Sequence, residues 1–398
     1  MSGSYETGRS AELLRRARRV DASFLARTGL LPGAELAGAP YPVFAERASG
    51  AYVWDVDGNV YVDYMLGFGS VILGHADPRV AEAVRRELDV DSAPTLNRTT
   101  QLELCEFLVG AVPNVDLVLL VRSGSEATAI AVRLARAHTG RPVVLHSGYH
   151  GWHDWCAPRR AGLPPGSEPA MGFRHNDVEA LERLLVAHED RVACVVTIPF
   201  ETELPEDGYL GAVRDLAHAH GALFVLDEVR TSFRLAIGGA QEYFGVDADL
   251  VAMGKALANG FALAAVGGRR DVMELLPELS ASSTFFRHTE AMAAACATAR
   301  ALREDAVPEK IRRTGERLLA ALETAARDFG LPARVVGHPS MPFVEFDVGD
   351  PDGARCRSRF VAEALARGVL VHPTHHWFVS AAHTEADVDR TADALTEA

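Results

Sequence analysis

The stretch DLVLLVRSGSEATAIAVRLARAHTGRPVVLHS, residues 116–147, decides the fold. It begins and ends with short apolar runs, 117–121 and 143–145, which predict two buried strands. Between them, small and apolar residues recur every three or four positions, which predicts a helix from Glu126 to a C-terminal cap at Gly140. A strand, a helix and a second strand in this order predict a parallel sheet with helices packed on its faces.

The same alternation extends from about residue 100 to about residue 270. Helical patterns occur near 178–188 and 210–220, between further apolar runs. These runs are VACVVTI at 192–198, ALFVLD at 222–227 and DLVAMG at 249–254. The middle of the chain is therefore predicted to be an α/β domain.

The flanking segments have a different pattern. The stretch GAYVWDVDGNVYVDYM, residues 50–65, alternates like a β-hairpin around Asp57-Gly58. Residues 308–398 mix amphipathic helices with short strands. We expect the N- and C-terminal segments to form a smaller α+β domain together. The predicted boundaries are 1–65, 66–300 and 301–398.

Composition excludes several classes of partner. The 398 residues include 40 basic and 54 acidic side chains, a net charge of −14, which argues against nucleic acid and anionic membranes as partners. No apolar run approaches the length of a membrane span, and the N-terminus has no signal-peptide pattern. The five cysteines have no CxxC spacing, which indicates a reducing compartment. We expect a cytoplasmic protein.

Ligands of open parallel sheets bind beyond the carboxyl ends of the strands, and four such ends carry suitable residues. After the first, Ser123, Gly124 and Ser125 open a helix. Free backbone N–H groups, hydroxyls and the positive end of the helix dipole would bind a phosphate monoester there. A serine is also common at an ordinary helix N-cap. This segment alone therefore does not distinguish a phosphate site from a helix cap.

The second strand end carries an aromatic residue and several histidines. Tyr149, in the sequence GYHGWHD, can lie flat against a planar ligand or pack as an ordinary tyrosine. His146, His150, His153 and Asp154 have spacings compatible with a metal site. The segment lacks an HExxH motif, which would place two ligands on one face of a helix. Its absence argues against a metal site.

The third and fourth strand ends bring a carboxylate and an amine. Asp227 ends a run predicted to be buried, where an ionised carboxylate requires a cation or strong donors; a structural salt bridge would suffice. Lys255 follows the next run among small residues, and an exposed lysine is the simple interpretation. The segment is not a P-loop, because Asp249 and Ala256 stand where that motif requires Gly and Ser or Thr.

A single ligand, pyridoxal phosphate, accounts for all four strand ends. It requires a phosphate site, an aromatic platform, a buried carboxylate and a lysine. Its aldehyde condenses with a lysine as a Schiff base, and its ring accepts electrons while a carboxylate keeps the pyridine nitrogen protonated. Lys255 and Asp227 fit these two requirements.

The chain resembles the class III, fold type I pyridoxal-phosphate aminotransferases over nearly its whole length, most nearly the glutamate-1-semialdehyde aminomutase branch. The matching segments include GAYVWDVDGNVYVDYM, ILGHADPRV, SGSEATAIAVRLARAHTGR, GYHGWHD, LDEVRTSFRLAIGGAQEYFGV, MGKALANG, VGGRRDVME, AMAAACAT and SAAHTEADVDRT. The resemblance implies an α/β fold, with a mainly parallel seven-stranded sheet flanked by helices in the large domain and a smaller α+β domain.

The resemblance also implies roles for individual residues. Lys255 resembles the Schiff-base lysine that moves a proton during the reaction, and Asp227 the partner of the pyridine nitrogen. Thr284 matches a threonine that reaches the phosphate of the neighbouring subunit, which implies a homodimer with shared active sites. The implied cofactor-binding residues are Ser123, Gly124, Ser125, Tyr149, His150, Asp227, Val229, Lys255 and Thr284.

The chain departs from the aminomutases where substrate specificity is set. The N-terminal segment that supplies their arginine for the substrate carboxylate has no counterpart here. A carboxylate normally requires a bidentate arginine. Arg122, Arg287 and His288 stand where the family has other residues, so they are candidate replacements or marks of a different substrate.

The leading hypothesis is an aminotransferase that moves an amino group between an amine donor and a carbonyl acceptor other than glutamate semialdehyde. The same residues would also serve the aminomutase itself, or an epimerase or lyase on this scaffold. Two hypotheses come from other classes, a metal hydrolase built on the histidines near Tyr149 and a catalytically inactive scaffold.

Overall fold

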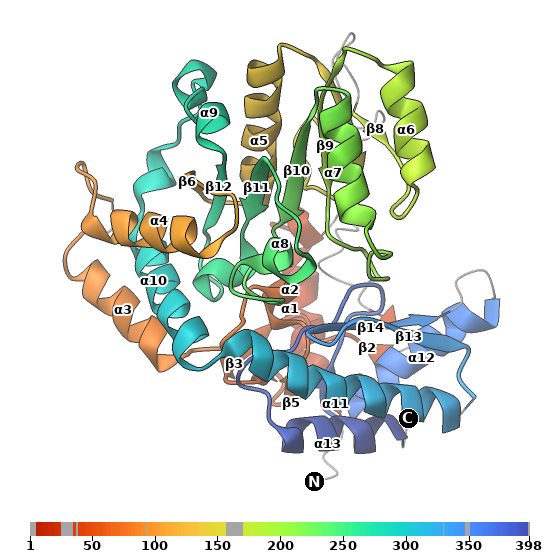
Figure 1. Ribbon diagram of the computed structural model, residues 1–398. Helices are drawn as coiled ribbons and strands as arrows, with labels where there is room; N and C mark the ends of the chain where they lie inside the picture. Colours follow the sequence, from red (N-terminus) through yellow and green to blue (C-terminus); the bar gives the residue numbers. More distant parts are fainter. Residues whose placement is uncertain are drawn as a thin grey trace. The chain divides into compact units, whose positions relative to one another are not determined.

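The computed structural model describes residues 5–24, 35–36, 39–91, 93–156, 170–328, 330–346 and 351–396. The chain divides into two compact units (Figure 1). One comprises residues 78–308, and the other joins residues 1–77 to residues 309–398. Among the described helices, none is long and apolar enough to cross a membrane.

The unit of residues 78–308 contains the predicted seven-stranded sheet. Its strand order is β6-β12-β11-β10-β9-β7-β8. The strands are β6 (Leu117–Val121), β7 (Val143–Ser147), β8 (Met171–Gly172), β9 (Val192–Thr197), β10 (Leu223–Glu228), β11 (Leu250–Met253) and β12 (Ala264–Gly268). Strand β12 is antiparallel to both of its neighbours, and the other pairs are parallel, which confirms the mainly parallel sheet.

Helices pack along this sheet, as the alternation predicted. The longer ones are α3 (Pro78–Leu88), α4 (Thr99–Ala111), α5 (Gly124–Thr139), α6 (Val178–Ala187), α7 (Tyr209–Ala219) and α10 (Thr289–Glu304), with the short α8 (Gly239–Phe244) and α9 (Arg270–Met273) between them. Buried residues of α5, among them Ile130 and Leu134, share a hydrophobic core with Leu223 and Val225 of β10. Helix α7 packs on β9 and β10, and α10 packs on α3 and α4 (Figure 1).

The other unit is built from both ends of the chain. The expected hairpin forms from β4 (Tyr52–Asp55) and β5 (Val60–Asp63). Strand β15 (Val369–Leu370) pairs with β5 in parallel, so the C-terminal segment completes a sheet begun near the N-terminus. The remaining elements are β1 (Glu35–Leu36), β2 (Ala39–Pro40), β3 (Ala45–Ser49), β13 (Ala333–His338), β14 (Met341–Phe346), α1 (Gly8–Ala17), α2 (Leu66–Gly69), α11 (Val307–Asp328), α12 (Pro351–Ala366) and α13 (Glu385–Thr396).

Candidate active site

The four strand ends singled out in the sequence lie at one edge of the sheet. Strands β7, β9, β10 and β11 are mutually parallel, and β6 runs in their direction because it is antiparallel to β12. Their carboxyl ends carry Ser123 to Ser125, Tyr149, Asp227 and Lys255. The sheet therefore brings the predicted site residues to the edge where parallel sheets bind ligands.

Helix α5 begins at Gly124 rather than at Glu126, because Ser123 is its N-cap. The Ser123 hydroxyl accepts a hydrogen bond from the Glu126 amide at 3.3 Å, and the Glu126 carboxylate accepts one from the Ser123 amide at 2.8 Å. This capping box uses the serine side chain. Among the described residues, none accepts a hydrogen bond from the amides of Gly124 or Ser125. Two N–H groups at the positive end of a 16-residue helix thus remain for an anion.

Gly124 is required by its close approach to Val229. A Cβ atom at Gly124 would lie 2.7 Å from Val229 Cγ1 and 2.8 Å from Cγ2, closer than Cβ atoms pack. A Cβ at Gly254 would meet the same Cγ1 at 3.3 Å. The Val229 side chain is therefore fixed between the start of α5 and the residue before Lys255.

Asp227 is buried and pairs with His150. Its Oδ2 lies 2.8 Å from His150 Nδ1, and its Oδ1 accepts a hydrogen bond from the Val229 amide at 3.0 Å. His150 Nε2 donates to the Ser147 carbonyl oxygen at 3.1 Å, because that oxygen can only accept. Nε2 therefore carries a hydrogen. The histidine fixes the carboxylate and leaves Oδ1 able to accept another hydrogen bond.

A hydroxyl from α5 fixes His150 in turn, a contact that no motif of the sequence predicts. Thr128 Oγ1 donates to the His150 carbonyl oxygen at 2.9 Å, and the Ser125 carbonyl oxygen lies 3.2 Å from the same hydroxyl. Gly151 permits the same approach, because a Cβ there would lie 2.2 Å from Ser125 Oγ. The loop that carries Tyr149 and His150 is thus held against the first turn of α5.

Glu228 faces away from this pair, although it is the next residue to Asp227. Its Oε2 accepts from the Ala240 amide at 2.5 Å and its Oε1 from the Gln241 amide at 3.0 Å, at the start of α8. Burial raises the pKa of the Glu228 carboxyl to about 7, against the effect of these hydrogen bonds. Successive side chains of a strand point to opposite faces, so one carboxylate reaches the site and the other holds α8.

Lys255 follows β11 and begins the 3₁₀ turn Lys255–Ala258. Its φ of 41° lies in the left-handed region, and the three residues after it are buried. Burial lowers the pKa of the Lys255 amine to about 8; Arg230 acts in the same direction, and Asp227 opposes it. The amine is therefore largely unprotonated at mildly alkaline pH, as a nucleophile requires.

Lysine is rare in this chain, which sets Lys255 apart from the other basic residues. Of the 40 basic residues only Lys255 and Lys310 are lysines, so the other 38 are arginines (40 − 2). Lys310 lies exposed on α11. At most surface positions, an arginine can supply the positive charge as well as a lysine can. An arginine cannot replace a lysine whose amine condenses with a carbonyl group.

Arg122 is already engaged by backbone carbonyls. Its guanidinium donates to the carbonyl oxygens of Ala262 at 3.2 Å, Phe286 at 2.8 Å and His288 at 3.1 Å. Arg287 donates to the Thr95 carbonyl oxygen at 3.0 Å. Arg122 therefore holds the segment around the exposed 3₁₀ turn Thr284–Arg287 rather than presenting a free fork to a substrate.

The histidines near Tyr149 pack against other aromatic rings. The His146 and His150 rings meet edge to face with their centroids 5.6 Å apart. Within the described ranges, no group of three or more histidine, cysteine or acidic residues is placed to bind a metal ion. The Tyr149 side chain is 73% exposed, which leaves its ring face accessible.

The match to a family model decides the family. The model described as Aminotransferase class-III matches residues 35–397. The chain is a class III aminotransferase. It is thus a pyridoxal-phosphate-dependent enzyme that acts on small-molecule substrates, as the sequence predicted.

Similar proteins include both transferases and mutases. The 3-aminobutyryl-CoA aminotransferase of Cloacimonas acidaminovorans (strain Evry) is 34% identical over 368 residues, covering 90% of this aminotransferase and 89% of that protein. The glutamate-1-semialdehyde 2,1-aminomutase of Desulforudis audaxviator (strain MP104C) is 38% identical over 392 residues, covering 90% of each. A structure of the PLP internal aldimine form of the Sphingopyxis sp. MTA144 FumI protein matches with a TM-score of 0.91 and 32% identity, covering 98% and 95% of the two chains.

The site of this aminotransferase fits the cofactor. The amides of Gly124 and Ser125 have no described acceptor, which suits a phosphate group. The buried Asp227 keeps one carboxylate oxygen able to accept from a pyridinium N–H. Lys255 supplies an amine of lowered pKa at the same sheet edge.

Proposed function

We propose that this enzyme transfers an amino group between an amine donor and a carbonyl acceptor, with Lys255 and Asp227 as its catalytic residues. One observation carries the proposal: the Asp227–His150 pair lies at the same sheet edge as Lys255 and the open amides of α5. When bound, pyridoxal phosphate supplies an aldehyde that condenses with amines and a ring that withdraws electrons from the substrate carbon.

Each residue of the site then has a definite role. The amides of Gly124 and Ser125 bind the phosphate, and the Ser125 hydroxyl supplements them. Asp227 accepts the pyridinium hydrogen bond, and His150 orients the carboxylate through the contact of 2.8 Å. Val229 would support one face of the ring, and the exposed Tyr149 would cover the other. The Lys255 amine, unprotonated above a pH of about 8, would serve as the base that accepts the proton from the substrate carbon.

The substrate is proposed to differ from glutamate semialdehyde. The arginine that the aminomutases use for its carboxylate is missing from the sequence, and the Arg122 guanidinium is occupied by three carbonyl oxygens. The relationship to 3-aminobutyryl-CoA aminotransferase supports a β-amino compound as donor.

We also propose a cytoplasmic homodimer. Thr284 is exposed at the start of its 3₁₀ turn and is available to a partner's phosphate site. Its neighbour Phe285 is 56% exposed, which suits an interface. Free thiols at all five cysteines agree with the cytoplasmic location.

A panel of amines separates transfer from mutation. We expect the purified holoenzyme, mixed with one β-amino acid or β-amino thioester at a time and no acceptor, to convert from the pyridoxal to the pyridoxamine form. The change is followed by absorbance. Isomerisation of glutamate semialdehyde, with no conversion by any donor, would contradict the proposal and favour the aminomutase.

Replacement of Gly124 by alanine should weaken cofactor binding. The new Cβ would overlap Val229, so either this side chain or the start of α5 must shift. We expect the Kd for pyridoxal phosphate to rise about tenfold, equivalent to about 1.4 kcal/mol. Gly211→Ala in α7 is the matched control, since a Cβ at Gly211 meets nothing within 4 Å. Unchanged affinity in Gly124→Ala would contradict the assignment of the phosphate site.

A further inference from the structure

Arg230 lies beside Lys255 at the edge of the sheet. Strands β10 and β11 pair in parallel and stay in register up to their last residues. The next residues, Val229 and Gly254, remain close, since a Cβ at Gly254 would lie 3.3 Å from Val229 Cγ1. Arg230 and Lys255 are the residues that follow these two. The arginine therefore leaves β10 at the level at which the lysine leaves β11.

The guanidinium of Arg230 is anchored beyond the end of β9, the other neighbour of β10. Its Nη2 donates to the Phe200 carbonyl oxygen and, at 3.2 Å, to the Glu201 carbonyl oxygen. Its Cζ lies 5.7 Å from the centroid of the Phe200 ring. Both hydrogen bonds use Nη2, whereas the three bonds of Arg122 involve Nη1 as well. These contacts hold one corner of the guanidinium at the carboxyl ends of β9 and β10.

The charge of Arg230 acts on the reacting amine. Burial is the main cause of the lowered pKa of Lys255, and Arg230 is the next; Asp227 opposes them, and Arg234 adds a smaller effect. Burial also lowers the pKa of the Arg230 guanidinium, against the effects of Glu201 and Asp227. An arginine nevertheless stays charged in proteins, and this side chain is only partly buried. A cation with reduced hydration therefore lies close to the reacting amine.

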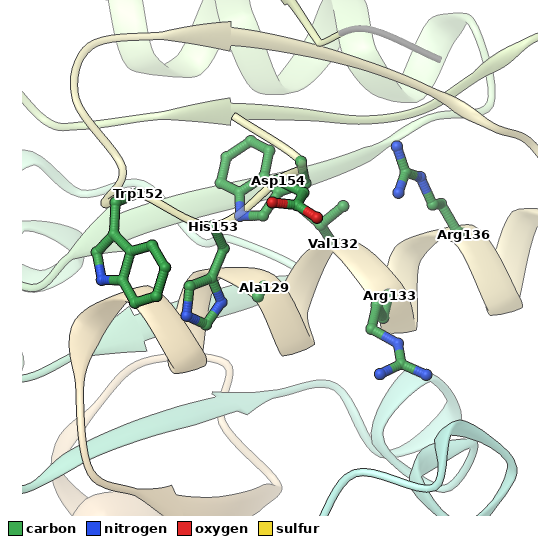
Figure 2. A pocket seen from close by; sticks show the side chains of 8 residues that line it. Ala129, Val132, Arg133, Arg136, Trp152, His153 and Asp154 are labelled. Carbon is green, nitrogen blue, oxygen red and sulfur yellow. The ribbon is translucent and has the colours of Figure 1, made fainter. Parts of the chain in front are cut away.

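The arginines of α5 form no comparable group. Figure 2 shows Arg133 and Arg136 beside a pocket on this helix, where their side chains point away from each other. Arg133 donates to the Leu279 carbonyl oxygen at 2.6 Å, and Arg136 donates to the Pro142 carbonyl oxygen at 3.0 Å. Two guanidinium groups that point apart do not bind one anion together.

We propose that Arg230 binds the acidic group of the substrate and thereby selects an amino acid with a free carboxylate over a simple amine or a thioester. This role rests on the proposed amino transfer and specifies its substrate class. A guanidinium binds a carboxylate through charge-assisted hydrogen bonds, which are roughly twice as strong as those between neutral groups. The two carboxylates that act on Arg230 allow this role, because water screens the exposed Glu201 and His150 is bonded to Asp227.

Two donors with the same carbon skeleton test the proposal. 3-Aminobutyrate carries the carboxylate, and 3-aminobutanamide has a neutral amide in its place. Each is mixed with the holoenzyme, and absorbance gives the donor concentration for half the maximal rate of conversion to the pyridoxamine form. In the native enzyme we expect this concentration to be about tenfold or more higher for the amide than for the acid. The ratio is taken at one pH, so the protonation of Lys255 affects both donors equally.

Three variants test whether Arg230 causes this preference. Arg230→Met removes the charge and should bring the half-maximal concentrations of the two donors to within about threefold of each other. Arg230→Lys keeps a charge without the planar fork and should restore part of the preference. Arg183→Met, at an exposed position of α6, is the control and should keep the native ratio. A native preference that persists in Arg230→Met would overturn the proposal, as would equal values for both donors in the native enzyme.

Binding without transfer separates this role from the transferase function. 3-Hydroxybutyrate has the carboxylate but no amine, and calorimetric titration of the holoenzyme gives its Kd. We expect the Kd to rise about tenfold or more in Arg230→Met and to keep its native value in Arg183→Met. A Kd that depends on Arg230, with neither donor converted, would refute amino transfer and leave the acid site standing. Equal Kd values in the native and Arg230→Met proteins, with both donors converted, would refute the role of Arg230 and leave the transferase function standing.

Discussion

Replacement of Lys255 by alanine should reduce amino transfer by on the order of 10³-fold or more. The variant loses both the amine that bonds to the cofactor and the base that moves the substrate proton, and proton transfer alone contributes roughly 10²–10⁴-fold. The cofactor should still bind, because the helix amides and Asp227 are unchanged. Steady-state kcat and the absorbance spectrum of the loaded protein measure the two effects separately.

Lys310→Ala is a matched control for this substitution. It removes the second of the two lysines, an exposed one on α11, and should leave kcat within about twofold. In the native enzyme, formation of the covalent bond to the cofactor should slow as the pH falls through about 8, because the Lys255 amine becomes protonated. A Lys255→Ala protein that retains native kcat would show that another group performs the chemistry.

Asp227→Asn should lower kcat by about 10²–10³-fold and retain some cofactor affinity. An amide has no charge with which to keep the pyridine nitrogen protonated, so the ring accepts electrons less well. The amide also faces His150 Nδ1 at the position where carboxylate Oδ2 now lies at 2.8 Å, which alters the contact that orients residue 227. Single-turnover rates of substrate proton exchange, measured at saturating cofactor, isolate this effect from binding.

Glu228→Gln is the control for Asp227→Asn. It shows whether the loss of kcat comes from the charge in the active site or from the loss of any buried carboxylate. Glu228 is the adjacent residue, is also buried, and accepts hydrogen bonds from the start of α8. Its substitution should lower Tm with little change in kcat per folded molecule. If Glu228→Gln lost as much kcat as Asp227→Asn, the charge of Asp227 would have no special role.

The sequence predicted the sheet and the helices between its strands because hydrophobic periodicity records which face of each element is buried. It also predicted which strand ends carry chemistry. It chose Asp227 for the pyridine nitrogen but assigned no role to the adjacent Glu228, whose contacts with the start of α8 depend on how the chain folds after β10. The sequence around Ser123 was compatible with phosphate binding and with helix capping. In the structure its hydroxyl accepts a hydrogen bond within the capping box of α5.

The local sequence pattern did not predict contacts between residues that lie far apart in the chain. Arg122 was a candidate for binding substrate, whereas its guanidinium binds carbonyl oxygens more than 100 residues away in the chain. The Thr128 contact with His150 depends in the same way on how helix α5 meets the loop after β7. Arg230, which lowers the pKa of Lys255, had one signal in the sequence, its place three residues after Asp227.

Borohydride reduction of the holoenzyme followed by peptide mapping tests the central claim most directly. Reduction fixes the cofactor to the amine that holds it, and the chain offers two lysines between which the map must decide. We predict a phosphopyridoxyl mass on the peptide that contains Lys255 and none on the peptide that contains Lys310. A protein that remains unlabelled after loading with pyridoxal phosphate, or one labelled at Lys310 alone, would contradict the account.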